Sequence, residues 1–336
     1  MTFIKKGPIK LYTERNFTQK FNDTFDFAGR NWKVMLRFLT YFMLPLSIVQ
    51  AMSLNAYMQS ILDMQNVNSM TGSEGALIQF LANYAATVVF YLIGTTMLFG
   101  IVFSLIKMYE ERNGEIAHLT FQELWPSLRR CALRALAATG TIIAYVILMI
   151  FIMVVFAMIH PAMSLIPLFG FFALCIPLSM LYPIYIFEDI SIVKAVIKAF
   201  NLGFRTWGGI FAITFVTSLI IGVVSNIVSV PYTIMIILKM GFGISSEFSS
   251  FVNGPVYGTI VYILGVITIF VSYLGYAIVC VALAFQYGHA ADKFSNEKID
   301  LDAYDFDNLQ PSSAKKVEED NGTKQRLDEI DDFEKL

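Results

Sequence analysis

The sequence predicts an all-α integral membrane bundle of six transmembrane helices, arranged as three helical hairpins. The first observation is composition: of 336 residues, 56% are hydrophobic and only 15% are charged, whereas a soluble domain has about 45–50% apolar residues. The second is segregation, because the apolar residues fall into six long blocks with most Lys and Arg between them. The third is a threefold recurrence of Trp, described below. A bilayer selects this pattern, since each spanning helix needs about 20 apolar residues.

Each of the six blocks is long enough to cross the hydrocarbon core as a helix. They cover residues 34–58, 76–108, 131–159, 168–187, 208–239 and 256–290. Four prolines lie inside them, where we expect kinks, because neighbouring helices can satisfy the carbonyls that a proline leaves unpaired. These are Pro45, Pro177, Pro183 and Pro231.

The basic residues between the blocks predict the orientation. Of 24 Lys and Arg residues, only Lys239 falls on the side opposite to the termini, which leaves 23 (24 − 1) on one side. Cytoplasmic connections of membrane proteins carry such an excess of Lys and Arg. The pattern therefore predicts that both termini are cytoplasmic.

Three tryptophans, Trp32, Trp125 and Trp207, each stand just before an odd-numbered block. An amphipathic stretch surrounds or precedes each one, at residues 13–31, 119–128 and 192–204. Such stretches are typical of helices that lie in the membrane interface, with Trp at the headgroup level. We expect a unit of interfacial helix and hairpin to be used three times; the alternative is that Trp enrichment at interfaces produces the pattern without a repeat.

The predicted organisation is an interfacial segment at 1–33, a transmembrane domain at 34–294, and an acidic, largely disordered cytoplasmic tail at 295–336. From Glu297 to Leu336 there are thirteen acidic and six basic residues, a net charge of −7. Such a segment buries too little apolar surface to offset its ordering entropy. An apolar side chain recurs every three residues near its end and would line one face of a short helix. A cytoplasmic protein partner could bind that face, but an unoccupied, frayed end is the favoured interpretation. That face consists of Leu327, Ile330, Phe333 and Leu336.

No catalytic, metal or cofactor motif is found, and nothing predicts binding to nucleic acid. The most suggestive polar candidates are Glu188 and Asp189, which could bind a cation or gate a path, although a charge stop at the interface is the favoured interpretation. Asn226 follows a small-residue stripe on the fifth block, which favours helix packing over a substrate site. The spans contain no centrally placed Asp, Glu, Lys or Arg, which argues against transport of a charged solute.

The stretch Phe187-Glu188-Asp189-Ile190-Ser191 is followed by Ala195, Ala199, Gly203 and Trp207. This pattern resembles bacterial membrane proteins related to the membrane domain of glycerophosphoryl diester phosphodiesterase, and the resemblance covers most of residues 15–293. In those phosphodiesterases a separate soluble barrel carries out the reaction, and this sequence contains no such barrel. The resemblance therefore implies a membrane module of the bacterial inner membrane without the enzyme.

The expected function is that of a non-enzymatic inner-membrane protein that organises lipid or partner proteins. A second hypothesis is a channel or carrier for a lipid or a small neutral solute, and a third is a membrane-embedded enzyme acting on lipid. A continuous polar cavity between the hairpins would favour the second, and convergent polar groups around a lipid-sized pocket would favour the third.

Overall fold

The computed structural model describes residues 7–65, 73–242 and 248–309, and these residues form helices and connecting turns without a β-strand. The chain divides into two units, Met1–His289 and Ala290–Leu336. The all-α class predicted from the sequence is confirmed. The helices in chain order are α1 (Phe17–Gln65), α2 (Ser73–Glu111), α3 (Phe121–Ile159), the short 3-10 helix η1 (Pro161–Ser164), α4 (Leu165–Ser179), α5 (Leu181–Phe187), α6 (Ile192–Arg205), α7 (Trp207–Phe242), α8 (Ser249–Val252) and α9 (Pro255–Leu309).

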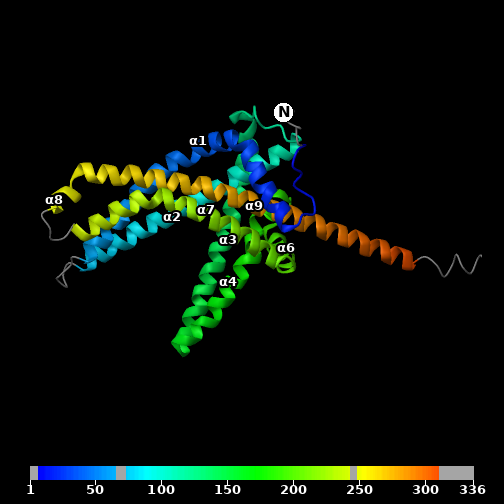
Figure 1. The fold of residues 1–336 in the computed structure, drawn as a ribbon. Coiled ribbons are helices and arrows are strands. Elements are labelled where there is room, and N and C mark those ends of the chain that lie inside the picture. Colours follow the sequence, from blue (N-terminus) through cyan, green and yellow to red (C-terminus); the bar gives the residue numbers. More distant parts are fainter. Residues whose placement is uncertain (1–6, 66–72, 243–247, 310–336) are drawn as a thin grey trace, which may run out of the picture. The chain divides into compact units, whose positions relative to one another are not determined.

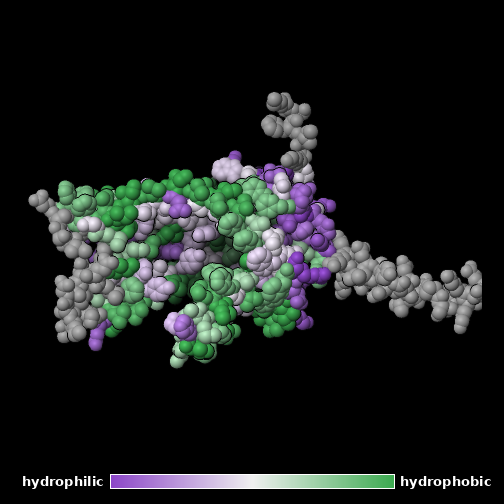
Figure 2. Space-filling model, turned by 60° about the horizontal axis from the view of Figure 1, so that its bottom comes forward, coloured by the Kyte–Doolittle hydropathy of each residue, from purple (hydrophilic) through white to green (hydrophobic). Residues whose placement is uncertain are grey.

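Six helical segments are long and apolar enough to cross a membrane, so the chain is a multi-pass membrane protein, as its composition predicts. They are Phe17–Ile61, Glu74–Glu111, Phe121–Ile159, Pro161–Phe187, Trp207–Phe242 and Pro255–Ser295. Figure 2 shows hydrophobic side chains covering much of the helical surface, while hydrophilic side chains gather where α1 begins. This distribution suits a surface that lipid chains surround.

The first unit has two ends, which we call the basic end and the far end (Figure 1). At the basic end α1, α3 and α7 begin and α2 ends. At the far end α2 and α9 begin and α7 ends. Helix α2 packs against both α1 and α3, and α7 packs against α1 and α4. Figure 1 shows the α3–α4 hairpin diverging from α1 and α2, and only 6% of the most apolar part of α3 is buried. Most of this hairpin is therefore not covered by the rest of the described chain.

The core is densest at the basic end. Phe27 of α1, Phe103 of α2 and Phe285 of α9 are almost fully buried there, and the rings of Phe27 and Phe285 meet edge to face at 5.8 Å. The turn that brings α2 back into α3 needs a left-handed residue, which Gly114 supplies with φ at 93°. The backbone N–H of Gly114 donates to the Tyr109 carbonyl at 2.8 Å and closes the turn.

The structure differs from the sequence expectations in the continuity of its helices. The first two amphipathic stretches are the opening turns of α1 and α3, so only the third, α6, is a separate helix. The fourth span is interrupted at Met180, between Pro177 and Pro183, where a kink was expected, whereas Pro45 and Pro231 stay inside continuous helices. Residues 295–309, expected to be part of the disordered tail, continue α9. The face at Leu327, Ile330, Phe333 and Leu336 lies outside the described residues.

Candidate functional site

The three predicted interfacial anchors lie on the protein surface. Trp32, Trp125 and Trp207 are 54%, 47% and 36% exposed. The indole of Trp125 stacks on Phe121 at 5.5 Å, and that of Trp207 donates its Nε1–H to the Ala173 carbonyl at 3.1 Å. An exposed indole with an anchored N–H suits the boundary between lipid and water.

Glu188 follows the last residue of α5, where the chain leaves the helix. Lys198 of α6 donates to its Oε2 at 2.7 Å, and the hydroxyl of Tyr287 on α9 donates to its Oε1 at 2.7 Å. Each carboxylate oxygen therefore has a partner already. This arrangement connects three helices at the basic end. Both carboxylate oxygens of Glu188 are already hydrogen-bonded, so neither is open to bind a cation.

The neighbouring Asp189 is exposed and pairs with two arginines of α3. Arg130 contacts its Oδ1, and Arg134 donates to the same oxygen at 2.9 Å. The hydrogen bond from Arg130, helped by the charge of Arg134, lowers the pKa of Asp189 below its ordinary value of 3.8. The acidic pair singled out in the sequence thus connects α3, α6 and α9 to the end of α5.

The chain before α1 lies across this network. The Leu11 backbone N–H donates to Glu110 at 3.2 Å, and the Arg15 backbone N–H donates to His289 Nδ1 at 3.0 Å. A Cβ on Gly288 would lie 2.2 Å from the Leu11 carbonyl oxygen, so glycine is required for this close approach. Burial raises the pKa of Tyr12 above its ordinary value of 10.0. Residues 7–16 thus close the basic end over Glu110 and Glu188.

Among the described residues, Asn226 makes no side-chain hydrogen bond to another helix. It is exposed on α7, and its Nδ2 donates to the Gly222 carbonyl of the same helix at 2.8 Å. A Cβ on Gly222 would meet nothing within 4 Å, so the small-residue stripe does not bring another helix close. The helix contact expected there occurs instead at Gly275, where a Cβ would lie 2.3 Å from Ile221.

Among the described residues no group of three or more His, Cys, Asp or Glu side chains could hold a metal ion. The carboxylates of Glu188 and Asp189 are paired with side chains of other helices. These contacts form a structural clamp rather than a binding site.

A groove between α2 and α3 has the features of such a site. It holds a cavity of about 290 Å³ whose walls are mainly apolar. Trp125 and Arg129 lie at its basic end, on one face of α3 since they are four residues apart. Within the described part of the chain, Arg129 is exposed and has no hydrogen bond or ion pair. The remaining lining residues are Ile93, Thr96, Met97, Leu128, Ala132, Leu133 and Leu136.

The groove narrows where the two helices approach most closely. A Cβ on Gly100 would lie 3.0 Å from the backbone of Ala132, so α2 and α3 are nearly in backbone contact at that level. Thr96 is nearly buried beside it, and its hydroxyl contacts that of Thr139 at 3.0 Å, so it presents little polarity to the groove. The result is a trough with one guanidinium at its end and hydrocarbon along its length.

Sequence reasoning singled out Trp125 in this groove and missed Arg129. The spacing of Trp125 and Arg129 along one helix face was a usable signal, because an aromatic ring beside a basic side chain at the interface is a common lipid-facing pair. The wall contributed by α2 carries no such signal, because the register between two helices is set by packing alone.

Comparison of the chain with known proteins found no relative. No protein-family model, no curated protein and no solved structure matches the chain.

Proposed function

We propose that this chain is a non-enzymatic membrane protein that organises lipid, holding an anionic phospholipid in the groove between α2 and α3. The observation that carries the proposal is an Arg129 that makes no hydrogen bond or ion pair within the described part of the chain and that lies at the end of an apolar trough. A phospholipid has the same two parts, a phosphate and an acyl chain. A guanidinium binds a phosphate through two parallel N–H donors, which an ammonium cannot match.

The length of the groove fits one leaflet. Trp125 and Leu136 are eleven residues apart (136 − 125), which is about 16 Å along a helix. One leaflet contributes about half of a hydrocarbon core of roughly 30 Å. With both termini cytoplasmic in a bacterial inner membrane, as the basic residues and the family resemblance suggest, Arg129 faces the inner leaflet. Anionic headgroups there favour the juxtamembrane basic residues.

The test is lipid binding to the full chain in detergent, measured by native mass spectrometry with phosphatidylglycerol. Arg129→Gln should weaken one binding event about tenfold, because a charge-assisted hydrogen bond is lost. Arg130→Gln is the matched control, since this next residue on the same helix is engaged with Asp189 outside the groove. Equal losses in the two variants would show that the effect is general surface charge, and no loss in Arg129→Gln would refute the groove.

Filling the groove gives a second, charge-independent arm. Leu133→Trp places a large side chain in the trough, and Leu148→Trp places one on exposed α3 surface outside it. We expect Leu133→Trp to lower lipid occupancy and Leu148→Trp to leave it unchanged. The opposite ranking would contradict an acyl chain in this groove.

A carrier or channel for a lipid or small neutral solute remains the second candidate, favoured by a different observation. A cavity of about 450 Å³ runs along α7, where Asn226, Ser229 and Thr233 alternate with apolar side chains. A neutral polar column suits an uncharged solute. Uptake of neutral solutes into proteoliposomes that falls in Asn226→Leu, with lipid binding unchanged, would favour this candidate.

A further inference from the structure

A second pocket lies at the far end, between α1, α7 and α9. It is a cavity of about 120 Å³, and its polar lining comes from Asn55, Gln59 and Lys239. This is several times the roughly 10–15 Å³ that one water molecule occupies. The apolar lining comes from Met58, Ile61, Ile236, Met240 and Val261.

The floor of this far-end pocket is packed, so the cavity is a built feature of the fold. Val261 is 4% exposed and belongs to a small core with Val252 and Tyr257, against which Ile236 packs. The Tyr257 hydroxyl donates to the Met235 carbonyl at 2.5 Å and ties α9 to α7. Beside the pocket, the Tyr232 hydroxyl donates to Asn55 Oδ1 at 3.4 Å and links α7 to α1.

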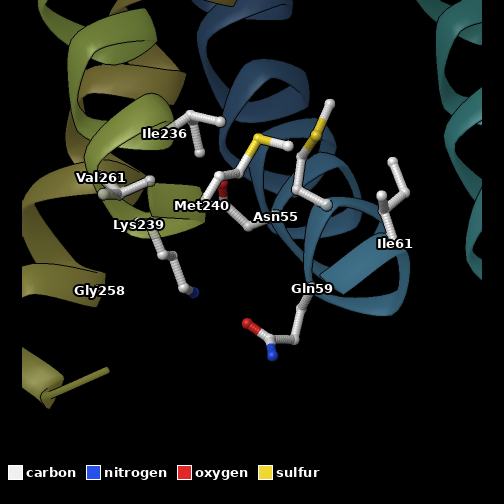
Figure 3. A pocket seen from close by; sticks show the side chains of 9 residues that line it. Asn55, Gln59, Ile61, Ile236, Lys239, Met240, Gly258 and Val261 are labelled. Atoms are coloured by element: carbon white, nitrogen blue, oxygen red, sulfur yellow. The ribbon is translucent and has the colours of Figure 1, made fainter. Parts of the chain in front are cut away.

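The polar side chains of the pocket lie on either side of one open space. Figure 3 shows the Lys239 ammonium and the Gln59 amide extending from α7 and α1 toward it. A Cβ on Gly258 of α9 would meet nothing within 4 Å, so the third wall is open there. The Lys239 ammonium that faces this opening presents a positive charge and hydrogen-bond donors to an anion.

The position of Lys239 argues that the charge is retained for a ligand. It is the one basic residue of 24 on the side opposite to the termini, where the charge bias of membrane proteins disfavours Lys. Within the described chain it makes no hydrogen bond or ion pair.

We propose that the far-end pocket binds the phosphate headgroup of an anionic membrane phospholipid, with Lys239 as counter-ion and Met58 and Met240 against the glycerol and first chain carbons. Methionine suits this contact because its flexible thioether adapts to irregular apolar shapes. The proposal extends the proposed lipid-organising function, yet the two sites share no residue. The protein would then hold one lipid at each end of the bundle.

The experiment measures binding of phosphatidylglycerol, phosphatidylcholine and inorganic phosphate to the full chain in detergent by native mass spectrometry. We expect two phosphatidylglycerol molecules per wild-type chain. In Lys239→Gln one of them should bind about tenfold more weakly. Lys239→Arg should retain both, and Lys194→Gln, an exposed lysine on α6, should also retain both. Phosphatidylcholine should bind the pocket more weakly, because its headgroup has no net charge.

Each opposing result is decisive. Unchanged binding in Lys239→Gln would overturn the proposal, and so would equal affinity for phosphatidylcholine. Displacement of the lipid by inorganic phosphate at equal concentration would show a site for a free anion and overturn the assignment to lipid. Failure of Arg129→Gln to reduce binding, with Lys239→Gln effective, would refute the α2–α3 groove alone and leave the far-end pocket standing.

Discussion

Replacement of Arg134 by Ala tests the clamp at the basic end, because this side chain satisfies the backbone where α5 ends. Its guanidinium donates to three carbonyls, those of Tyr185 at 2.5 Å, Glu188 at 2.7 Å and Ile190 at 2.9 Å. Helix ends leave their last carbonyls without intrahelical partners. The side chain is 17% exposed, so little water reaches it.

The expected loss follows from these three bonds. A hydrogen bond from a charged donor contributes about 1.5–3 kcal/mol, and water replaces part of each bond at the half-buried carbonyls. We therefore expect Arg134→Ala to lower the free energy of unfolding by about 2–4 kcal/mol. Arg134→Lys should recover only a small part, because an ammonium lacks the planar fork that reaches three acceptors.

Arg130→Ala is the control within the same helix. Arg130 pairs with the same carboxylate of Asp189, yet its side chain is 55% exposed and contacts no backbone carbonyl among the described residues. Exposed ion pairs of this kind contribute little to stability, so we expect a much smaller loss than in Arg134→Ala. Unfolding in mixed micelles with increasing dodecyl sulfate, followed by circular dichroism, gives both values. Equal losses in Arg134→Ala and Arg130→Ala would refute the reasoning, since the carbonyl contacts would then carry no weight.

Three further predictions concern helix packing, acidity and orientation. Gly203→Ala should destabilise the protein, because its Cβ would lie 2.5 Å from the α4 backbone, whereas Gly222→Ala has open space and should stabilise α7 slightly in the same unfolding assay. Because the pKa of Asp189 is lower in the folded protein than its ordinary value of 3.8, its ion pairs stabilise the fold above that pH. This stabilisation is lost as the pH falls through the lowered pKa. Wild type should therefore lose more stability than Asp189→Asn in strong acid, and identical acid profiles would contradict this ion pair. An impermeant thiol reagent on intact cells should label a cysteine at Gln59 and not one at Lys194; the reverse pattern would invert the proposed orientation.

The six spans were predictable from the sequence because the thickness of the bilayer fixes the length and apolar character of each crossing helix. Helix continuity was less predictable. Between Asn31 and Val34 no Gly or Pro interrupts the pattern, so the amphipathic stretch runs on into α1. At the third hairpin α6 ends at Arg205, and Thr206 separates it from α7. The positions of Gly and Pro do not distinguish the two cases, because Pro126 lies inside continuous α3 and Gly208 and Gly209 lie inside α7.

The site was predictable only in part. Glu188 and Asp189 were recognised as a polar pair, but their partners Lys198, Tyr287 and Arg134 come from three other helices. A sequence read alone gives no distance between helices. The same limit applies to both proposed lipid sites, since Arg129 becomes notable only when the apolar wall of α2 lies beside it.

A lipid bound along α2 and α3 is the central claim, and a cryo-electron microscopy map of the full chain in nanodiscs containing phosphatidylglycerol tests it most directly. The account predicts elongated density in the groove, with its phosphate within hydrogen-bond distance of the Arg129 guanidinium and its chain reaching Leu136. The same density should be absent in Arg129→Gln discs. A groove that is empty in wild type, or one closed by direct contact of α2 with α3 along its whole length, would contradict the account.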